Sequence, residues 1–458
     1  NSDDDDNDDT GEGTIDRNMI WFLLSMIGSV IAVVSVLINV LLGALAPMLI
    51  QISLIVSPLM FFITFVGSLV ILNIPVALFS LVMSIVGIYY ACHVWHRIPF
   101  ATANLKIALS AIQDNHGLWF LAYLYTVKAY VWTFLWCCAV TELVIFSPSW
   151  VYDCTSTSTN SSNNNNDDDD DDDDVCHVST RGKFIAIGML LSFFWSGQVL
   201  KNILHTTIAG VVGTWWFDPE DARSDSSRGN GSSGCFSFSC CGCSRAIYDS
   251  WYRSCVYSFG SICFGSLLVS VLQVVQFIVR CGRRQQRDQR RQQRSIEATD
   301  FIFCLLQYLV DTLEYLLEFI NTWAFVYVGL YGYDYWTAGK EVTTLFKARG
   351  WSVIINDHLV ARSLLMMSSL IGLITGLVGV LLGLVFLGPL YALPAFFLGL
   401  ILGGASCEIL FGVVTSAVNT VVVCFAESPN QLRINHDPQL SHDLIQAWRK
   451  AYPQDCGF

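Results

Sequence analysis

Long stretches without charge dominate the chain. Between Arg17 and Arg97 there is no Asp, Glu, Lys or Arg over 79 positions. As helix this stretch would extend about 118 Å, whereas a bilayer core is about 30 Å thick and takes about 20 residues to cross. The stretch is therefore expected to cross a membrane three times, at 19–46, 48–72 and 74–96.

The same pattern continues to residue 426. Residues 363–426 contain one charged residue, Glu408, and are long enough for two crossings with a turn at Gly388 and Pro389. Single helical crossings are predicted at 117–146, 184–217, 251–279 and 301–332. Because only helices satisfy their own backbone polar groups at these lengths in lipid, the predicted fold is all-α, a polytopic transmembrane helical bundle over 19–426 with nine visible spans.

The first residue is Asn1, and an acidic tract precedes the first span. A signal peptide begins with a positive region instead. We therefore expect an upstream segment that is missing here, in which one more span would bring the total to ten.

Composition agrees with a membrane protein. The chain is 53% apolar and 14% charged, with a mean hydropathy of +0.50, whereas soluble domains carry about 25% charged residues. This excludes a water-soluble globular enzyme and a disordered chain. The net charge of −13 arises from six aspartates within residues 3–9 and the run Asp167–Asp174. Since such tracts are usually solvated and disordered, the acidity gives no reason to infer an acidic or a basic partner, and we expect no binding of nucleic acid.

Lysines and arginines near span ends favour the cytoplasmic side. They place the linker 97–116 and the tail 427–458 in the cytoplasm, and the disordered acidic segment 1–18 and the Asn/Asp-rich loop 147–183 outside. Simple alternation, however, puts the arginine-rich segment 280–294 outside, against this rule. Either 251–279 or 301–332 does not cross fully, or the number of crossings is wrong by one, so the sidedness of this segment stays open.

Two features of the loop fit an extracellular position. Cys154 and Cys176 bracket it, and a disulfide between them suits an oxidising compartment. Asn160 begins a sequence for N-glycosylation. We predict both modifications.

The sequence contains no motif of an enzyme. It has no phosphate-binding loop, no nucleophile elbow, no zinc-protease motif and no dinucleotide fingerprint. Four cysteines, Cys235, Cys240, Cys241 and Cys243, cluster without a second pair or a nearby histidine, which favours palmitoylation or free thiols over zinc. We expect no enzymatic activity, no cofactor and no metal.

A polar stripe occupies the predicted crossing at 184–217. Trp195, Gln198, Asn202 and His205 are spaced by three, four and three residues, so they share one helix face. Such groups at membrane depth usually face an aqueous path or the bundle interior. Hydrogen bonding that only holds the helices together is the alternative. Both interpretations stay open for Gln198 and Asn202, whereas a functional role is favoured for Trp195 and His205.

The same spacing recurs in 301–332. Asp311, Glu314, Glu318 and Asn321 share a face there, followed by Tyr331. An alternative is an interfacial amphipathic helix whose acids meet water or the upstream arginines. That alternative is favoured for Asp311 and Glu314, whereas Glu318 lies deeper in the apolar stretch.

Aromatic residues are abundant in span 117–146, which also holds Lys128 and Glu142. The aromatic residues are Trp119, Tyr123, Tyr130, Trp132 and Trp136. A quaternary ammonium offers no N–H group, so it is bound by ring faces beside a carboxylate, with about 2 kcal/mol per well-placed ring.

Groups of glycines occur within the predicted span 184–217 and within the segment 363–426. Gly210 and Gly213 either open the helix toward a cavity or allow close packing. A run of small-residue repeats, for which packing is the expected role, consists of Gly372, Gly376, Gly379 and Gly383.

Several blocks carry a family resemblance. They read RIPFA at 97–101, FFWSGQVLKN at 193–202, GTWWF at 213–217, SFGSICFGSL at 258–267, NTWAFV at 321–326, LYG at 330–332 and CFAESP at 424–429, followed by Asn435 and His436. In this order they resemble the choline transporter-like family, in the short-loop branch of fungi, plants and protists.

The resemblance implies ten spans with cytoplasmic termini and transport of choline or related cationic amines, by exchange with protons, across the plasma membrane or an organelle membrane. The leading hypothesis is an aromatic cage of Trp195, Trp215 and Tyr331, with Glu318 or Glu142 as counter-charge and His205 exchanging a proton. Gln198, Asn202 and Asn321 complete the expected substrate site. The alternatives are a non-transporting membrane scaffold or signalling protein and, more weakly, a channel.

Overall fold

The computed structural model describes most of the chain from residue 48 onward. The described residues are 48, 50–146, 152–155, 175–220, 244–290, 297–348, 359–386 and 388–451. The first predicted span, both acidic tracts, the Asn160 sequon and the cluster Cys235–Cys243 lie outside them.

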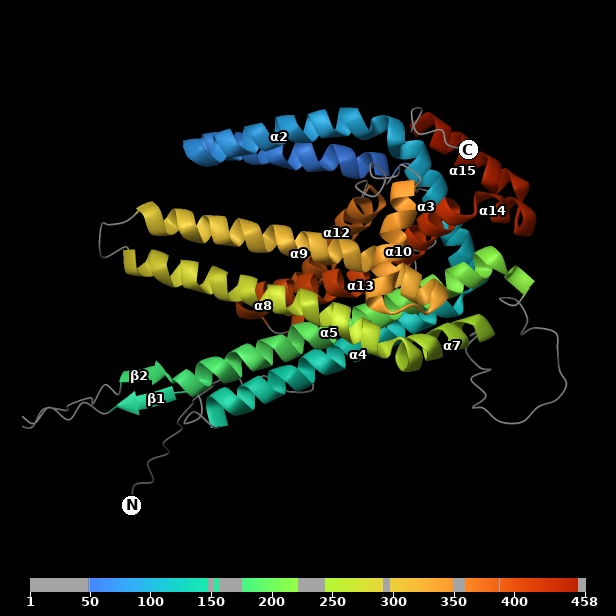
Figure 1. The fold of residues 1–458 in the computed structure, drawn as a ribbon. Helices are drawn as coiled ribbons and strands as arrows, with labels where there is room; N and C mark the ends of the chain where they lie inside the picture. The colour runs from blue at the N-terminus through green and yellow to red at the C-terminus, as the bar shows by residue number, and fades with distance from the viewer. Residues whose placement is uncertain are drawn as a thin grey trace, which may run out of the picture.

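The described part is a bundle of long helices (Figure 1). Among the described residues, seven helices are long and apolar enough to cross a membrane: Ile50–Val70, Ile74–Asp114, Gly117–Ile145, Thr180–Phe217, Phe259–Arg284, Leu359–Phe386 and Pro389–Glu427. An eighth, α9 (Glu297–Tyr331), has the length but carries several carboxylates. The spans predicted from residue 48 onward therefore correspond to helices, and the all-α polytopic fold is confirmed.

The named elements follow the chain in order. They are α2 (Ile74–Val94), η1 (Trp95–Arg97), α3 (Ile98–Asp114), α4 (Gly117–Thr141), η2 (Glu142–Phe146), β1 (Tyr152–Thr155), β2 (Val175–Val178), α5 (Thr180–Phe217), α7 (Arg245–Tyr252), η4 (Arg253–Tyr257), α8 (Phe259–Arg290), α9, α10 (Tyr335–Ala348), α12 (Leu359–Phe386), η5 (Pro389–Tyr391), α13 (Ala392–Glu427), α14 (Pro429–Asn435) and α15 (Pro438–Ala451). The turn predicted before α13 falls at Gly388, whose φ of 92° is readily adopted by glycine.

The two ends of the bundle differ. At one end, α4 leads to β1 and β2 leads into α5, and the two strands pair antiparallel with Cys154 opposite Cys176. We call this the strand end. The opposite end carries α7, α10, α14 and α15 (Figure 1), and we call it the tail end. From the lysines and arginines of the linker and the tail, we expect the tail end to be cytoplasmic.

The linker predicted at 97–116 is a buried helix. Ile107, Ala108 and Ile112 of α3 are at most 1% exposed, while Lys106 points outward. The tail also packs against this helix, since the ring of Trp448 on α15 lies 5.3 Å from that of Phe100. The tail end therefore has a core of its own, which charge counting alone did not reveal.

Exposure along the helices marks an apolar belt in the half nearer the strand end. On α4, most of 117–126 is buried, whereas most of 127–145 is exposed and apolar. On α5, residues 202–213 are all buried, but residues 184–201 are exposed or half-buried. Apolar side chains left exposed in such a band are those expected to face lipid.

The arginine-rich segment begins at the strand end. Because α8 runs antiparallel to α5 and α9, its last turns lie near the start of α9. Arg280 lies 3.7 Å from the Asp311 carboxylate, and Arg283 donates to the side-chain oxygen of Gln307. The two helices thus lie side by side as an antiparallel pair, and part of the positive charge is compensated between them.

Glycines let α12 and α13 approach closely. A β-carbon on Gly372 would lie 3.0 Å from the carbonyl oxygen of Leu400, and one on Gly379 would collide with the carbonyl oxygen of Ala395. On α5, a β-carbon on Gly210 would lie 2.8 Å from the Ser250 hydroxyl. The packing interpretation therefore holds for these glycines.

Candidate functional site

His205 joins three helices inside the bundle. Its Nδ1 atom lies 2.6 Å from the hydroxyl oxygen of Ser416 on α13, and its Nε2 atom lies 3.0 Å from the carbonyl oxygen of Thr322 on α9. A carbonyl only accepts hydrogen bonds, so the proton belongs on Nε2. A neutral imidazole satisfies both partners, and the ring is only 9% exposed.

The two predicted polar stripes meet beside this junction. Asn202 donates to the Ser266 hydroxyl at 2.8 Å, and Asn321 donates to the carbonyl oxygen of Gly265 at 3.0 Å. Tyr335 in turn donates to the side-chain oxygen of Asn321. Both asparagines thus bind consecutive residues of α8, which is hydrogen bonding between helices rather than an open polar surface. Gln198 is half-buried one turn closer to the strand end.

The carboxylates of the second stripe point in different directions. Gln276 on α8 donates to Asp311 at 2.8 Å and also to Glu314, so these two acids face α8 and its arginines. This agrees with the alternative favoured for them. Glu318, one turn further along, is exposed.

A cluster of aromatic rings and carboxylates lies where α9 and α13 end. The ring of Tyr331 lies 5.2 Å from that of Tyr327 and 5.6 Å from that of Tyr333, measured between centroids. The Tyr331 hydroxyl donates to the Glu427 carboxylate. We call Tyr327, Tyr331, Tyr333 and Glu427 the tyrosine–glutamate cluster.

The cluster is accessible at the tail end. Tyr331 and Tyr333 are 41% and 44% exposed, whereas Tyr327 is 5% exposed. Ring faces beside a carboxylate offer an organic cation both cation–π attraction and a counter-charge. Among the described residues, no three His, Cys, Asp or Glu side chains gather as metal ligands.

The structure does not bring the expected cage together. Trp195 and Trp215 are 20 positions apart on α5, which is about 30 Å along a helix. Trp195 donates to the carbonyl oxygen of Cys263 at 3.1 Å, whereas the Trp215 indole donates to the Asp114 carboxylate at 2.7 Å. Only Tyr331, of the three rings, lies beside a carboxylate of the cluster.

The expected counter-charges are also distant from Tyr331. Glu318 precedes it by 13 positions on α9, about 20 Å along the axis. Glu142 is exposed at the end of α4, near the strand end. The carboxylate that contacts Tyr331 is that of Glu427, which the sequence analysis assigned to the tail. Glu427 lies in the CFAESP block at 424–429, and this block was the feature of the sequence that could have indicated it.

Trp215 has a different environment, at the junction of α3, α5 and α14. Its ring stacks on that of His436 with centroids 3.8 Å apart. Asn435 donates to the carbonyl oxygens of Trp216 and Phe217, each at 3.0 Å. These residues of the GTWWF block hold the tail against the bundle.

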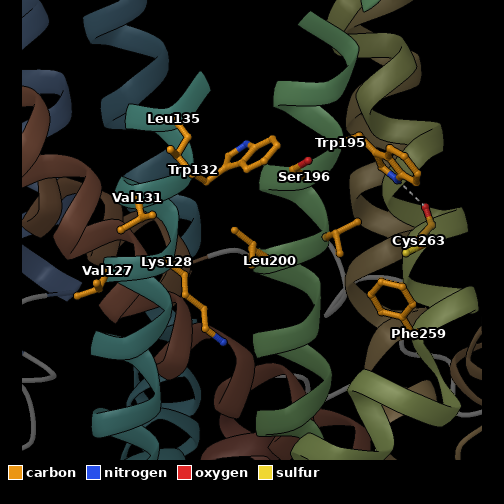
Figure 2. Close-up of a pocket in the computed structure, with 11 residues that line it drawn as sticks. Val127, Lys128, Val131, Trp132, Leu135, Trp195, Ser196, Leu200, Phe259 and Cys263 are labelled. Carbon is orange, nitrogen blue, oxygen red and sulfur yellow. Dashed lines mark hydrogen bonds between the residues drawn. The ribbon is translucent and has the colours of Figure 1, made fainter. Parts of the chain in front are cut away.

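An apolar groove of about 510 Å³ lies between α4, α5 and α8 (Figure 2). Trp132, Trp195 and several aliphatic side chains line it, and Lys128 is the one charged residue among the described residues of the lining. Since a lysine repels cations, this groove does not have the chemistry of a choline site.

Comparison with known proteins gives a family match. The family model described as plasma-membrane choline transporter matches residues 78–430. The chain is similar to the protein PNS1 of Gibberella zeae, with 28% identity over 59% of this chain and 47% of the relative. It is also similar to PNS1 of Debaryomyces hansenii, with 24% identity over 80% and 64%, and of Saccharomyces cerevisiae, with 24% over 77% and 60%. The matched part thus spans about half to two thirds of these relatives.

Proposed function

Because the chain belongs to the plasma-membrane choline transporter family and contains several helices long and apolar enough to cross a membrane, we propose that it carries choline or a related cationic amine across the membrane. We further propose that the tyrosine–glutamate cluster binds this cation at the tail end. The observation that supports the site most directly is the contact of Tyr331 with Glu427 beside two further tyrosine rings.

The chemistry of the cluster suits a quaternary ammonium. Such an ion cannot donate an N–H hydrogen bond, so its binding depends on ring faces and on nearby negative charge. Each exposed ring contributes about 0.5–1 kcal/mol and a desolvated one about 2 kcal/mol. The Tyr331 hydroxyl holds the Glu427 carboxylate next to the rings, so the counter-charge is already positioned before the cation binds.

Protonation of Glu427 would oppose cation binding at the same place. A proton and a choline ion cannot both neutralise one carboxylate, so each would displace the other. This competition is the way in which the exchange with protons implied by the family resemblance would operate here. His205 has a different part in the proposal, because both its ring nitrogens are engaged in holding helices together.

The route proposed for the cation follows α9. Thr322, which accepts from His205, precedes Tyr331 by nine positions, about 14 Å along the helix. Passage beyond the cluster requires α5, α9 and α13 to separate where His205 now joins them. Alternating exposure of a site to the two sides by such movements is common among transporters.

Uptake by the purified full-length protein in proteoliposomes tests the function. Radiolabelled choline should accumulate in a saturable way, above the level in protein-free vesicles, and unlabelled choline should compete. Equal accumulation in both vesicle types, with insertion of the protein verified, would favour the non-transporting membrane protein instead.

A further inference from the structure

The groove between α4, α5 and α8 has a distinct polarity along its length. Val127, Val131 and Leu135 form one stripe of its α4 wall and are 53–58% exposed. Lys128 stands at the end of the groove nearer the tail end, and Figure 2 shows its side chain extending toward α5 and away from the level of Leu135. The groove is thus apolar along its walls and positively charged at one end.

Lys128 stands at the boundary of the apolar belt. Residues 117–126 of α4 are mostly buried in the tail-end core, and the exposed apolar band begins at Val127. On α5 the same change occurs next to Lys201, which is exposed and directly follows the groove residue Leu200. Lysine side chains at such boundaries place the ammonium group at the level of lipid headgroups.

The positive charge at this level is not neutralised within the described part of the chain. The ammonium of Lys128 lies 4.7 Å from the centroid of the Tyr125 ring, and no described carboxylate lies within ion-pair distance of it. The hydroxyl of Tyr125 accepts from Trp251 at 3.2 Å, which fixes the ring under the lysine. Arg253, two residues after Trp251, is exposed and adds further positive charge at this level.

We propose that this groove binds one anionic phospholipid from the leaflet on the tail-end side. An acyl chain lies along the apolar walls past Trp132 and Trp195, and the phosphate contacts Lys128, with Lys201 and Arg253 adding attraction. Basic residues at the edge of a membrane span favour anionic lipids in this way. The site is separate from the tyrosine–glutamate cluster and does not depend on the proposed transport function.

Two other occupants fit the charge less well. A choline ion in the groove would meet the Lys128 ammonium without a carboxylate. The predicted span 19–46 could cover apolar walls, but residues 18–96 contain no Asp or Glu, so this segment offers no negative charge to the lysine. An anionic lipid supplies both the apolar chain and the charge.

Native mass spectrometry of the purified full-length protein tests the site, with dioleoylphosphatidylglycerol and dioleoylphosphatidylcholine as probes. We expect one phosphatidylglycerol to bind more tightly than phosphatidylcholine. Lys128→Ala should weaken phosphatidylglycerol binding about fivefold, equivalent to about 1 kcal/mol, while Lys128→Arg retains it. Lys183→Ala, which removes a lysine near the strand end, is the matched control and should change nothing.

Val131→Trp tests the apolar part, because a large ring there fills the groove and should weaken binding of both lipids. The proposal is overturned if Lys128→Ala binds phosphatidylglycerol as tightly as the unchanged protein, or if Val131→Trp has no effect on either lipid. Displacement of the bound lipid by added choline would also overturn it, since the groove would then belong to the substrate route.

Discussion

The Nδ1 atom of His205 lies 2.6 Å from the hydroxyl oxygen of Ser416, which ties α5 to α13 inside the bundle. The other ring nitrogen binds the carbonyl oxygen of Thr322 on α9. A histidine placed in this way is a structural connection between three helices. It is also the connection that has to break if these helices separate during transport.

Removal of the imidazole should therefore destabilise the protein. His205→Ala leaves the Ser416 hydroxyl and the Thr322 carbonyl without this partner, which we expect to cost about 2 kcal/mol, whereas Ser416→Ala should cost about 1 kcal/mol. The double variant should lose less than the sum, because the two residues share one hydrogen bond. Thermal unfolding in detergent, monitored by the fraction of protein that stays monodisperse, ranks the variants by stability.

Ser369→Ala is the control for this series, because the exposed Ser369 hydroxyl donates to the carbonyl oxygen of Leu365 within its own helix and joins no second helix in the described part of the chain. Its melting temperature should match that of the unchanged protein. Strict additivity of His205→Ala and Ser416→Ala would contradict the shared contact.

Close packing of α12 on α13 gives a second prediction. A β-carbon at Gly379 would collide with the backbone oxygen of Ala395, whereas one at Gly412 meets nothing within 4 Å. Gly379→Ala should destabilise the protein by about 1–3 kcal/mol through overpacking. Gly412→Ala should be neutral or stabilising by about 0.5–1 kcal/mol, because alanine is the better helix former. Equal melting temperatures for the two variants would show that α12 and α13 are not packed as described.

The strand pair gives a prediction about sidedness. Cys154 and Cys176 are directly opposite in the antiparallel ladder, where the α-carbons of partner residues are about 4.5–5.5 Å apart. A disulfide spans a similar distance, about 4.4–6.8 Å. Peptide mass spectrometry without reduction should find the two cysteines linked. Two free thiols in protein taken from its native membrane would place the strand end on the reducing side and invert the expected sidedness.

The spans could be predicted from the sequence because a charge-free segment of lipid length has few other stable conformations. The burial of α3 could not, since Lys106 and the polar residues around it resemble a cytoplasmic linker until α15 and α13 are known to cover the other faces. Spacing showed that Asn202 and His205 share a face, and the structure confirms that this face is buried. Spacing along one helix cannot show which other helix that face meets.

The site illustrates this limit. The sequence indicated Tyr331 as a cation-binding ring but paired it with Trp195 and Trp215, because all three are aromatic residues in blocks that carry the family resemblance. Trp195 and Trp215 are too far apart along α5 to belong to one cage. Glu427 was overlooked because it ends α13 at the boundary of the tail, and only the fold brings that boundary to the end of α9.

The direct test of the central claim is the rate of choline uptake by Glu427→Gln in proteoliposomes. The amide keeps the shape of the side chain and removes its charge, so the apparent KM for choline should rise about tenfold or more, equivalent to about 1.4 kcal/mol or more. Tyr331→Ala should raise it about fivefold through loss of one exposed ring. Glu220→Gln, which changes an exposed carboxylate just after α5 at the same end, should leave KM unchanged. If Glu427→Gln and Glu220→Gln transport choline with the same KM as the unchanged protein, the cation does not bind at the tyrosine–glutamate cluster.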